Sequence, residues 1–143
     1  MKPVTVSVTI DRPREAVYAL LSDLPAHEAF TDHYLVDWRP TADGVRVRMK
    51  GGGEAEIRVV EQTPDRIVEH GHDVKDGTHR TTGIYTLTPT AAGGTDVTFT
   101  NELRPAGLGE RLAGPVVGAY LRRQNGRAMQ RLRALLESGA ATA

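Results

Sequence analysis

The sequence contains no cysteine, and this absence removes several kinds of chemistry at once. Without thiols the chain can form no disulfide, no thiolate zinc site and no cysteine nucleophile. The sequence also has no excess of charge, because 18 lysine and arginine residues balance 18 aspartate and glutamate residues. A neutral balance disfavours nucleic acid as a partner, since binding its phosphates requires a surplus of positive charge.

Long hydrophobic runs and several enzyme motifs are also absent. No apolar stretch approaches the roughly 18 residues of a membrane span, and the first ten residues are too polar for a signal peptide. We therefore expect no membrane span and a cytoplasmic location. There is no GxSxG elbow, no P-loop, no GxGxxG after a strand and no HExxH pair. These absences count against nucleophilic hydrolysis, phosphoryl transfer and dinucleotide chemistry, and the sequence predicts no cofactor.

What the chain does contain is a series of amphipathic segments within 143 residues, a length typical of one domain, which we expect to span residues 1–143. Apolar residues alternate over 4–10, as in a strand with one buried face. Helical spacing follows over 13–22 and in a shorter piece over about 25–32. Six more strands are predicted, at 34–39, 45–50, around 55–59, 66–74, 78–88 and 95–104. A long helix then runs to about residue 137, its start delayed or kinked by Pro115.

This order of segments predicts an α+β fold. A curved antiparallel sheet of about seven strands would wrap around the long C-terminal helix, with two short helices after strand one. Only the last helix is long enough to cover the apolar face of such a sheet. We expect a ligand cavity where the helix and the curved sheet do not touch.

The turn at Asp76-Gly77 predicts a two-residue hairpin that fixes which residues of its two strands face each other. In that register His70 lies opposite Gly83 and His72 lies opposite Thr81, with both imidazoles inside the cavity. A histidine there could remove a proton next to a carbonyl group, which makes His70 and His72 the catalytic candidates. They could equally be half-buried side chains without a chemical role. A competing register would put Glu69 inside and both histidines in water.

Further residues are predicted to line the cavity or to reach its ligand. The tyrosines among them could donate hydrogen bonds to a ligand carbonyl or could simply be core aromatics. A metal site formed by the histidines is disfavoured because no inward Asp, Glu or Cys completes a tetrahedral set, so no metal is predicted. The ligand-binding candidates are Tyr34, Trp38, Ile57, Val59, His79, Thr81, Gly83, Tyr85, Phe99, Asn101, Tyr120 and Gln124.

The last predicted helix is basic. Six arginines between residues 111 and 133 stand against only Glu110 and Glu137. Such a pattern usually forms a solvated face, but it could also receive an acidic partner or anionic lipid. The sequence is compatible with either a monomer or a homodimer.

Three parts of the chain carry a family resemblance: VTIDRP at 8–13 with AVY at 16–18 and LSD at 21–23, GTDVTFT at 94–100 with Glu102, and RLRALLE at 131–137. Together they resemble the START/Bet v 1-like superfamily, and within it the polyketide cyclase/dehydrase-like group. The resemblance covers nearly the whole chain and implies the helix-grip fold. It is specific for the fold rather than for an activity.

The resemblance also implies a kind of activity. Aromatase/cyclases of this group bind a poly-β-ketone, usually tethered to a carrier protein, and promote aldol cyclisation and dehydration. An acyl carrier protein is therefore an implied partner. The tyrosine of their pockets matches Tyr34, whereas their pocket arginines correspond to Val59 and His72 and the tryptophan at the pocket mouth to His27.

Three functions follow from these observations. The first is binding of a hydrophobic small molecule with cyclase, aromatase or dehydratase activity on a poly-β-carbonyl substrate. The second is a non-catalytic carrier or sensor of a lipid-like metabolite. The third is an interaction module whose basic terminal helix docks a partner.

Overall fold

The computed structural model describes residues 2–105 and 107–139. Its seven strands form one antiparallel sheet in the order β1-β7-β6-β5-β4-β3-β2. The strands are β1 (Val4–Ile10), β2 (Leu35–Pro40), β3 (Val45–Met49), β4 (Glu54–Thr63), β5 (Arg66–Asp73), β6 (His79–Pro89) and β7 (Thr95–Leu103). The helices are α1 (Arg14–Leu21), η1 (Leu24–His27), α2 (Glu28–Thr31), α3 (Leu108–Leu112) and α4 (Gly114–Glu137).

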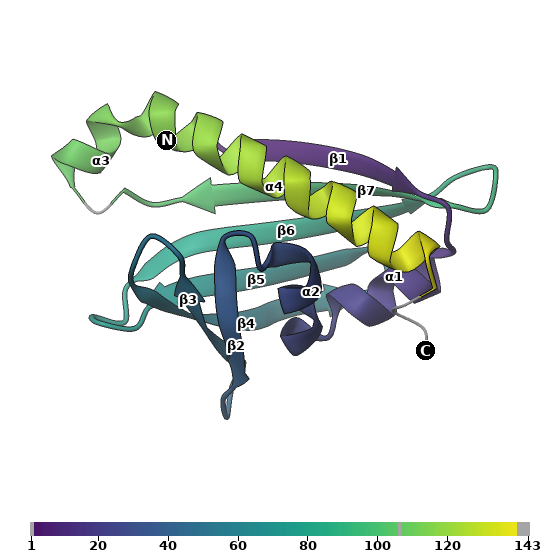
Figure 1. The fold of residues 1–143 in the computed structure, drawn as a ribbon, viewed down its shortest axis with the longest axis horizontal. Coiled ribbons are helices and arrows are strands. Elements are labelled where there is room, and N and C mark those ends of the chain that lie inside the picture. Colours follow the sequence, from purple (N-terminus) through teal and green to yellow (C-terminus); the bar gives the residue numbers. More distant parts are fainter. Residues whose placement is uncertain (1, 106, 140–143) are drawn as a thin grey trace.

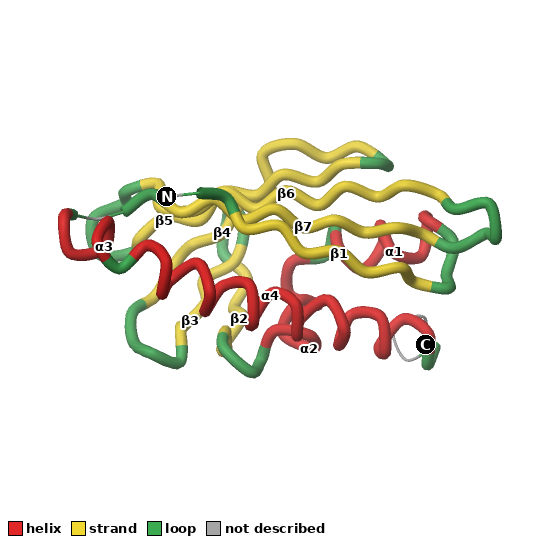
Figure 2. Tube along the Cα trace, turned by 90° about the horizontal axis from the view of Figure 1, so that it is seen from above, coloured by secondary structure: helices red, strands yellow, loops and turns green. Residues whose placement is uncertain are grey.

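The sheet and the helices form two layers. Seen from above in Figure 2, the curled sheet lies on one side and α4 runs along the other. Figure 1 shows α4 crossing the sheet diagonally, with α1 and α2 near its C-terminal half and α3 beyond its N-terminal end. This is the predicted helix-grip α+β fold, with the short helices after the first strand and the long helix at the end.

Prolines set where the helices begin. Pro13 is the N-cap residue of α1, and Pro25 and Pro115 lie in the first turns of η1 and α4. These positions suit proline because the first N–H groups of a helix have no intrahelical acceptor. The prediction that Pro115 delays the long helix is confirmed, because a short separate helix, α3, comes before it.

The core is packed at one end of the sheet and only partly covered at the other. The buried residues of α4 all lie in its second half, from Asn125 to Leu136, where they pack against Leu87, Val97 and other apolar residues of the sheet. No residue of the first half, 114–124, is buried. The inward-facing residues beneath that half, among them Thr81, Asn101 and Leu103, stay partly exposed. The concave face of the sheet is therefore accessible under the first half of α4.

Candidate functional site

The register of the β5–β6 hairpin decides which side chains face α4, and the predicted register was wrong by one residue. Gly83 lies opposite Glu69 rather than His70, and Thr81 lies opposite Gly71 rather than His72. The neighbouring β6–β7 register agrees with the prediction, since Gly83 pairs with Asn101 and Tyr85 with Phe99. Glu69 therefore takes the place in the inward row that the sequence had given to His70.

A loop and a bulge together cause this shift. The chain turns through residues 74–77, because the Asp73 backbone N–H donates to the Thr78 carbonyl (2.9 Å). This loop is two residues longer than the predicted turn, which changes the pairing by an even number of residues. By itself it would therefore leave His70 and His72 on the predicted inner face. The ladder then shifts by one residue, because Gly71 pairs with Thr81 but His72 pairs with His79, which leaves Arg80 as the extra residue of a bulge. One extra residue turns every following side chain to the opposite face.

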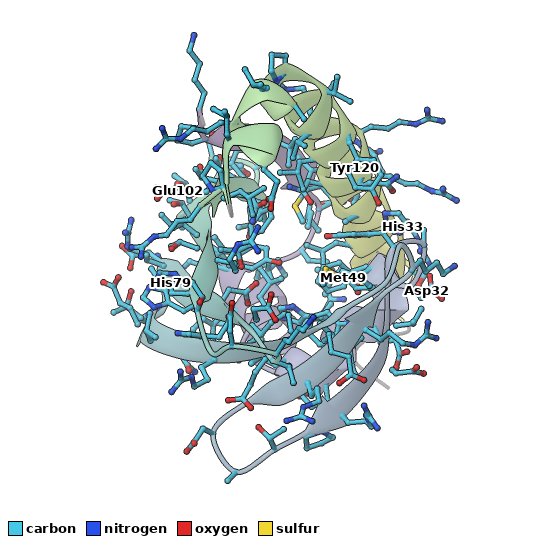
Figure 3. All side chains as sticks on the ribbon, turned by 90° about the vertical axis from the view of Figure 1, so that its left-hand side faces the viewer. Asp32, His33, Met49, His79, Glu102 and Tyr120 are labelled. Carbon is cyan, nitrogen blue, oxygen red and sulfur yellow. The ribbon has the colours of Figure 1, made fainter. Side chains whose placement is uncertain are left out.

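The three histidines predicted inside the cavity consequently lie together on the outer face. The His79 ring stacks on His70 with centroids 4.1 Å apart and on His72 at 5.2 Å. His79 Nε2 also lies 3.0 Å from the Thr82 hydroxyl. Figure 3 shows His79 and Glu102 on the side of the sheet away from α4, while Tyr120 and His33 lie along the helix. The expectation that these imidazoles face the ligand cavity was wrong.

Desolvation is the main reason that the pKa of both His70 and His72 lies below its usual value. Neighbouring positive groups lower these pKa values further: His79, His72, Arg104 and Arg58 act on His70, and Arg58 and His79 act on His72. The His70 and His72 rings are therefore largely neutral at pH 7. Among the described residues, no three side chains of the ligating types lie close enough together to hold a metal ion.

Glu69 is the most unusual residue of the concave face. Its side chain is buried among apolar residues, and its Oε2 atom has no hydrogen-bond partner. Burial raises the pKa of this carboxyl to about 7. A carboxylic acid with such a pKa exchanges its proton near neutral pH, as acid–base catalysis requires.

Two tyrosines lie close to this carboxyl. Burial, and then the nearby Glu69 charge, raise the pKa of both Tyr34 and Tyr85. Both phenols are therefore protonated at neutral pH and can donate hydrogen bonds. The Tyr34 hydroxyl donates to Asn125 Oδ1 (3.2 Å), which joins the residue before β2 to the middle of α4.

Asn125 completes this polar group. It is buried in α4, and while its oxygen accepts from Tyr34, its Nδ2 atom has no partner. An unpaired buried donor is unfavourable by about 1–3 kcal/mol, so it marks a place where a ligand or a water molecule belongs. We call Glu69, Tyr34 and Asn125 the interior polar cluster.

Aromatic rings surround one side of this cluster. His27 is buried and lies between Phe30, Trp38 and Tyr85, with centroid separations of 5.0, 5.5 and 6.0 Å. Its Nε2–H donates to the Leu21 carbonyl (2.8 Å), and burial lowers its pKa to about 4, so the ring is neutral. The Trp38 indole N–H is buried without a partner.

Most of the other ligand-binding candidates lie on the concave face of the sheet, and two lie on α4. The residues on the concave face are Ile57, Val59, Thr81, Gly83, Tyr85, Phe99 and Asn101, as predicted from their strands. On α4, Gln124 is partly buried and its carbonyl lies 3.1 Å from His33 Nε2, whereas the Tyr120 side chain is largely exposed. From the sequence, Asn125 lies beside the apolar stripe of the last helix and is either a ligand contact or the edge of that stripe, and Glu69 faces inward only in the competing register.

Two surface hollows lie elsewhere on the molecule. One of about 170 Å³ is on the outer face, lined by Arg46, Glu56, Arg58, His72, Asp73, Val74 and Gly77. The other, of about 480 Å³, lies where the edge of β1 meets α4 and is lined by Ser7, Val8, Thr9, Asp96, Thr98, Gln130 and Arg133. Neither is bordered by the interior polar cluster. The candidate site is instead the partly covered concave face next to that cluster.

Gly83 leaves the space that the Glu69 side chain occupies. A Cβ atom at residue 83 would lie 3.1 Å from Glu69 Oε1 and 3.0 Å from the Phe99 ring. We expect Gly83→Ala to displace both side chains and to lower the free energy of unfolding by about 1–3 kcal/mol, measured by urea denaturation. Gly118→Ala is the matched control: its Cβ would meet nothing within 4 Å, so it should be neutral or stabilise α4 by up to about 1 kcal/mol. Equal effects of the two variants would contradict this account of Gly83.

Several solved structures have the same fold as this chain. The chain is similar to the ZhuI aromatase/cyclase of Streptomyces sp. R1128, with a TM-score of 0.72, 15% identity and coverage of 97% of this chain and 95% of that one. It is also similar to DR_A0006 of Deinococcus radiodurans, with a TM-score of 0.70, 21% identity and coverage of 96% and 99%. The two-domain aromatase/cyclase BexL of the BE-7585A pathway matches with a TM-score of 0.74 and 17% identity, covering 98% of this chain and 48% of BexL. At these identities the likeness shows the fold.

The sequence comparisons address the family directly. A search of curated proteins finds no match. None of the helices among the described residues is long and apolar enough to span a membrane. Residues 1–137 match the family described as polyketide cyclase / dehydrase and lipid transport. Since the match extends over nearly the whole chain, the protein belongs to the polyketide cyclase/dehydrase and lipid transport family.

Proposed function

We propose that this protein binds a hydrophobic carbonyl compound between the concave face of the sheet and the first half of α4, and promotes its cyclisation or dehydration. The observation that carries this proposal is the interior polar cluster. Glu69 Oε2 and Asn125 Nδ2 are both buried and unpartnered, and Tyr34 lies next to both residues. Membership of a family that includes polyketide cyclases and dehydrases supports the same kind of function.

The unpaired atoms define the chemistry of the ligand. Asn125 Nδ2 can donate a hydrogen bond to a carbonyl oxygen, and Glu69 can take a proton from, or donate one to, an adjacent group of the ligand. The surrounding walls are apolar, because Ile57, Phe99 and Tyr85 lie on the neighbouring strands. A long β-keto chain fits this combination, since it alternates polar oxygens with carbon atoms that apolar walls can hold.

Glu69 takes the acid–base role in this proposal. Its pKa of about 7 means that a large fraction is ionised at neutral pH, and the carboxylate is poorly solvated. The carboxylate removes a proton from the carbon between two carbonyl groups, and the electron pair moves to oxygen as an enolate held by the Asn125 amide. The enolate carbon attacks another carbonyl of the same chain, and the new alkoxide takes the proton back from Glu69. Elimination of that hydroxyl with an α-proton releases water.

The test uses a long-chain 3-oxoacyl N-acetylcysteamine thioester as the probe. Exchange of its α-protons for deuterium, followed by NMR in D2O, reports proton abstraction directly. We expect the protein to accelerate exchange, and Glu69→Gln to reduce the protein-dependent rate by at least about 100-fold. Thioester binding, followed by the fluorescence of the single tryptophan, should be retained because glutamine keeps the shape of the side chain.

A variant on the outer face provides the control. His70→Gln should leave both exchange and binding unchanged, since His70 lies on the opposite side of the sheet from Glu69. Loss of exchange in His70→Gln with full exchange in Glu69→Gln would contradict the assignment. If the thioester binds but exchanges at the rate seen without protein, the protein is a carrier rather than an enzyme.

A further inference from the structure

A row of large apolar side chains lies exposed at the start of the terminal helical region. Leu108 and Leu112 of α3 are 71% and 76% exposed, and Val116 and Tyr120 of α4 are 73% and 52% exposed. The two residues of each helix are four positions apart, so each pair lies on one face of its own helix. We call these four residues the α3–α4 face. An exposed apolar row of this kind marks an interaction site more often than isolated surface residues do.

Positive charge borders this row. Arg111 follows Leu108 by three positions and Arg123 follows Tyr120 by three, which places each arginine on the same side of its helix as the apolar residue. Arg111, Arg122 and Arg123 are exposed, and none of them forms an ion pair with another described residue. The acid within α3, Glu110, is engaged by Arg80 Nη2 at 2.6 Å. The partner of this face therefore carries negative charge.

The low polarity of residues 107–121 favours a lipid bilayer over a protein as the partner. Among residues 107–121, only Glu110, Arg111 and Tyr120 have polar side chains. Protein interfaces contain about one hydrogen bond per 100–200 Å², spread over their area, whereas the polar groups here only border the apolar row. An apolar helix face that enters a bilayer needs no hydrogen bonds. A second copy of the chain is disfavoured, because a two-fold contact through this face would bring two positively charged surfaces together.

We propose that the α3–α4 face docks on an anionic lipid bilayer, with the apolar row entering the interface and the arginines contacting the headgroups. This inference goes beyond the proposed function and does not depend on whether Glu69 is catalytic. Exposed leucine, valine and tyrosine beside unpaired arginines are the composition expected of an interfacial helix.

The α3–α4 face lies near the open part of the concave surface of the sheet. Tyr120, at its C-terminal end, is near enough to raise the pKa of Tyr34, although burial and Glu69 have larger effects. Tyr34 belongs to the interior polar cluster, and the sheet beneath this half of α4 is only partly covered. A protein docked through this face would therefore hold the open end of its concave surface close to the membrane, where an apolar ligand is concentrated.

The experiment is co-sedimentation of the whole chain with vesicles of phosphatidylcholine alone and of phosphatidylcholine containing about one-third phosphatidylglycerol. We expect binding to the anionic vesicles that weakens as salt is added. Arg111→Gln with Arg123→Gln should lower the partition coefficient about 25-fold, from about fivefold for each charge. Leu108→Ser with Leu112→Ser should lower it at least about tenfold, without unfolding the protein, because neither leucine is in the core.

Matched variants elsewhere on the surface test whether the location matters. Arg39→Gln with Arg48→Gln removes two exposed arginine charges from β2 and β3, and Val60→Ser removes an exposed apolar side chain from β4. Both should bind anionic vesicles like the wild type. Equal loss in these controls, or no binding of the wild type to either kind of vesicle, would overturn the proposal. So would binding through the α3–α4 face to an acidic carrier protein with no partition onto vesicles.

Discussion

Glu69→Gln is expected to gain stability relative to the wild type as the pH rises from 4 to 8. The folded-state pKa of Glu69, about 7, lies above its usual value of 4.5 because the carboxyl is buried. Between these two pH values the folded state binds more protons than the unfolded state, so this group's contribution to stability falls as the pH rises. The shift corresponds to about 3 kcal/mol, which glutamine does not lose because it does not ionise.

The measurement is urea denaturation of both proteins at several pH values, with the difference in unfolding free energy plotted against pH. A matched control is Glu61→Gln, which removes an exposed carboxylate of β4 that pairs with Arg66 at 3.0 Å. Its difference from the wild type should change by no more than about 1 kcal/mol over the same range. A flat difference for Glu69→Gln would mean that Glu69 is not buried as a shifted acid, and the acid–base role would then have no basis.

The sequence predicted the fold well because its signals are local. Alternating apolar residues identified the strands, and the prolines beside α1 and α4 marked where those helices begin. Pairing of β6 with β7 was also predicted correctly, since the short turn before Thr95 leaves the inward row of Tyr85 and Phe99 in place. Strand alternation, helix starts and short turns are each determined by a few neighbouring residues, so they can be read from the sequence without knowledge of distant contacts.

The site was predicted less well because it depends on one nonlocal detail. The bulge at Arg80 is held by contacts that no local pattern reveals: Arg80 donates from Nε to the Arg104 carbonyl (3.0 Å) and pairs with Glu110 of α3. Without that bulge, the histidines of β5 would face inward in place of Glu69. With it, the inward side chain is Glu69, which the sequence had offered only as the competing register.

The inward placement of Glu69 also changes which groups could do chemistry. A histidine stack in the cavity would have supplied several bases of similar strength. The structure instead places one carboxyl beside two phenols and one amide, a set that contains a single group able to exchange a proton near neutral pH. The proposed reaction is correspondingly simple, with one acid–base residue and fixed hydrogen-bond donors.

His27 should show the opposite pH dependence. Burial lowers its pKa from 6.5 to about 4, so between these values the unfolded state binds the extra proton and stability falls as the pH decreases. This contribution is about 3 kcal/mol at and above pH 6.5 and is lost by pH 4. In the wild type it cancels the Glu69 contribution between pH 4.5 and 6.5, where each residue changes the proton count by one in opposite directions.

Removing one residue of the pair should therefore expose the slope of the other. We expect Glu69→Gln to lose stability as the pH falls from 6.5 to 4, and His27→Asn to lose stability as the pH rises from 4.5 to 7. His27→Asn is also less stable at every pH, because the ring's packing and its hydrogen bond to the Leu21 carbonyl are lost, but only the slope matters here. The double variant should be nearly flat, and Glu61→Gln, which removes the exposed carboxylate of β4, should retain the wild-type profile to within about 1 kcal/mol. If the two single variants had slopes of the same sign, at least one of these side chains would not have the buried environment on which the proposed site depends.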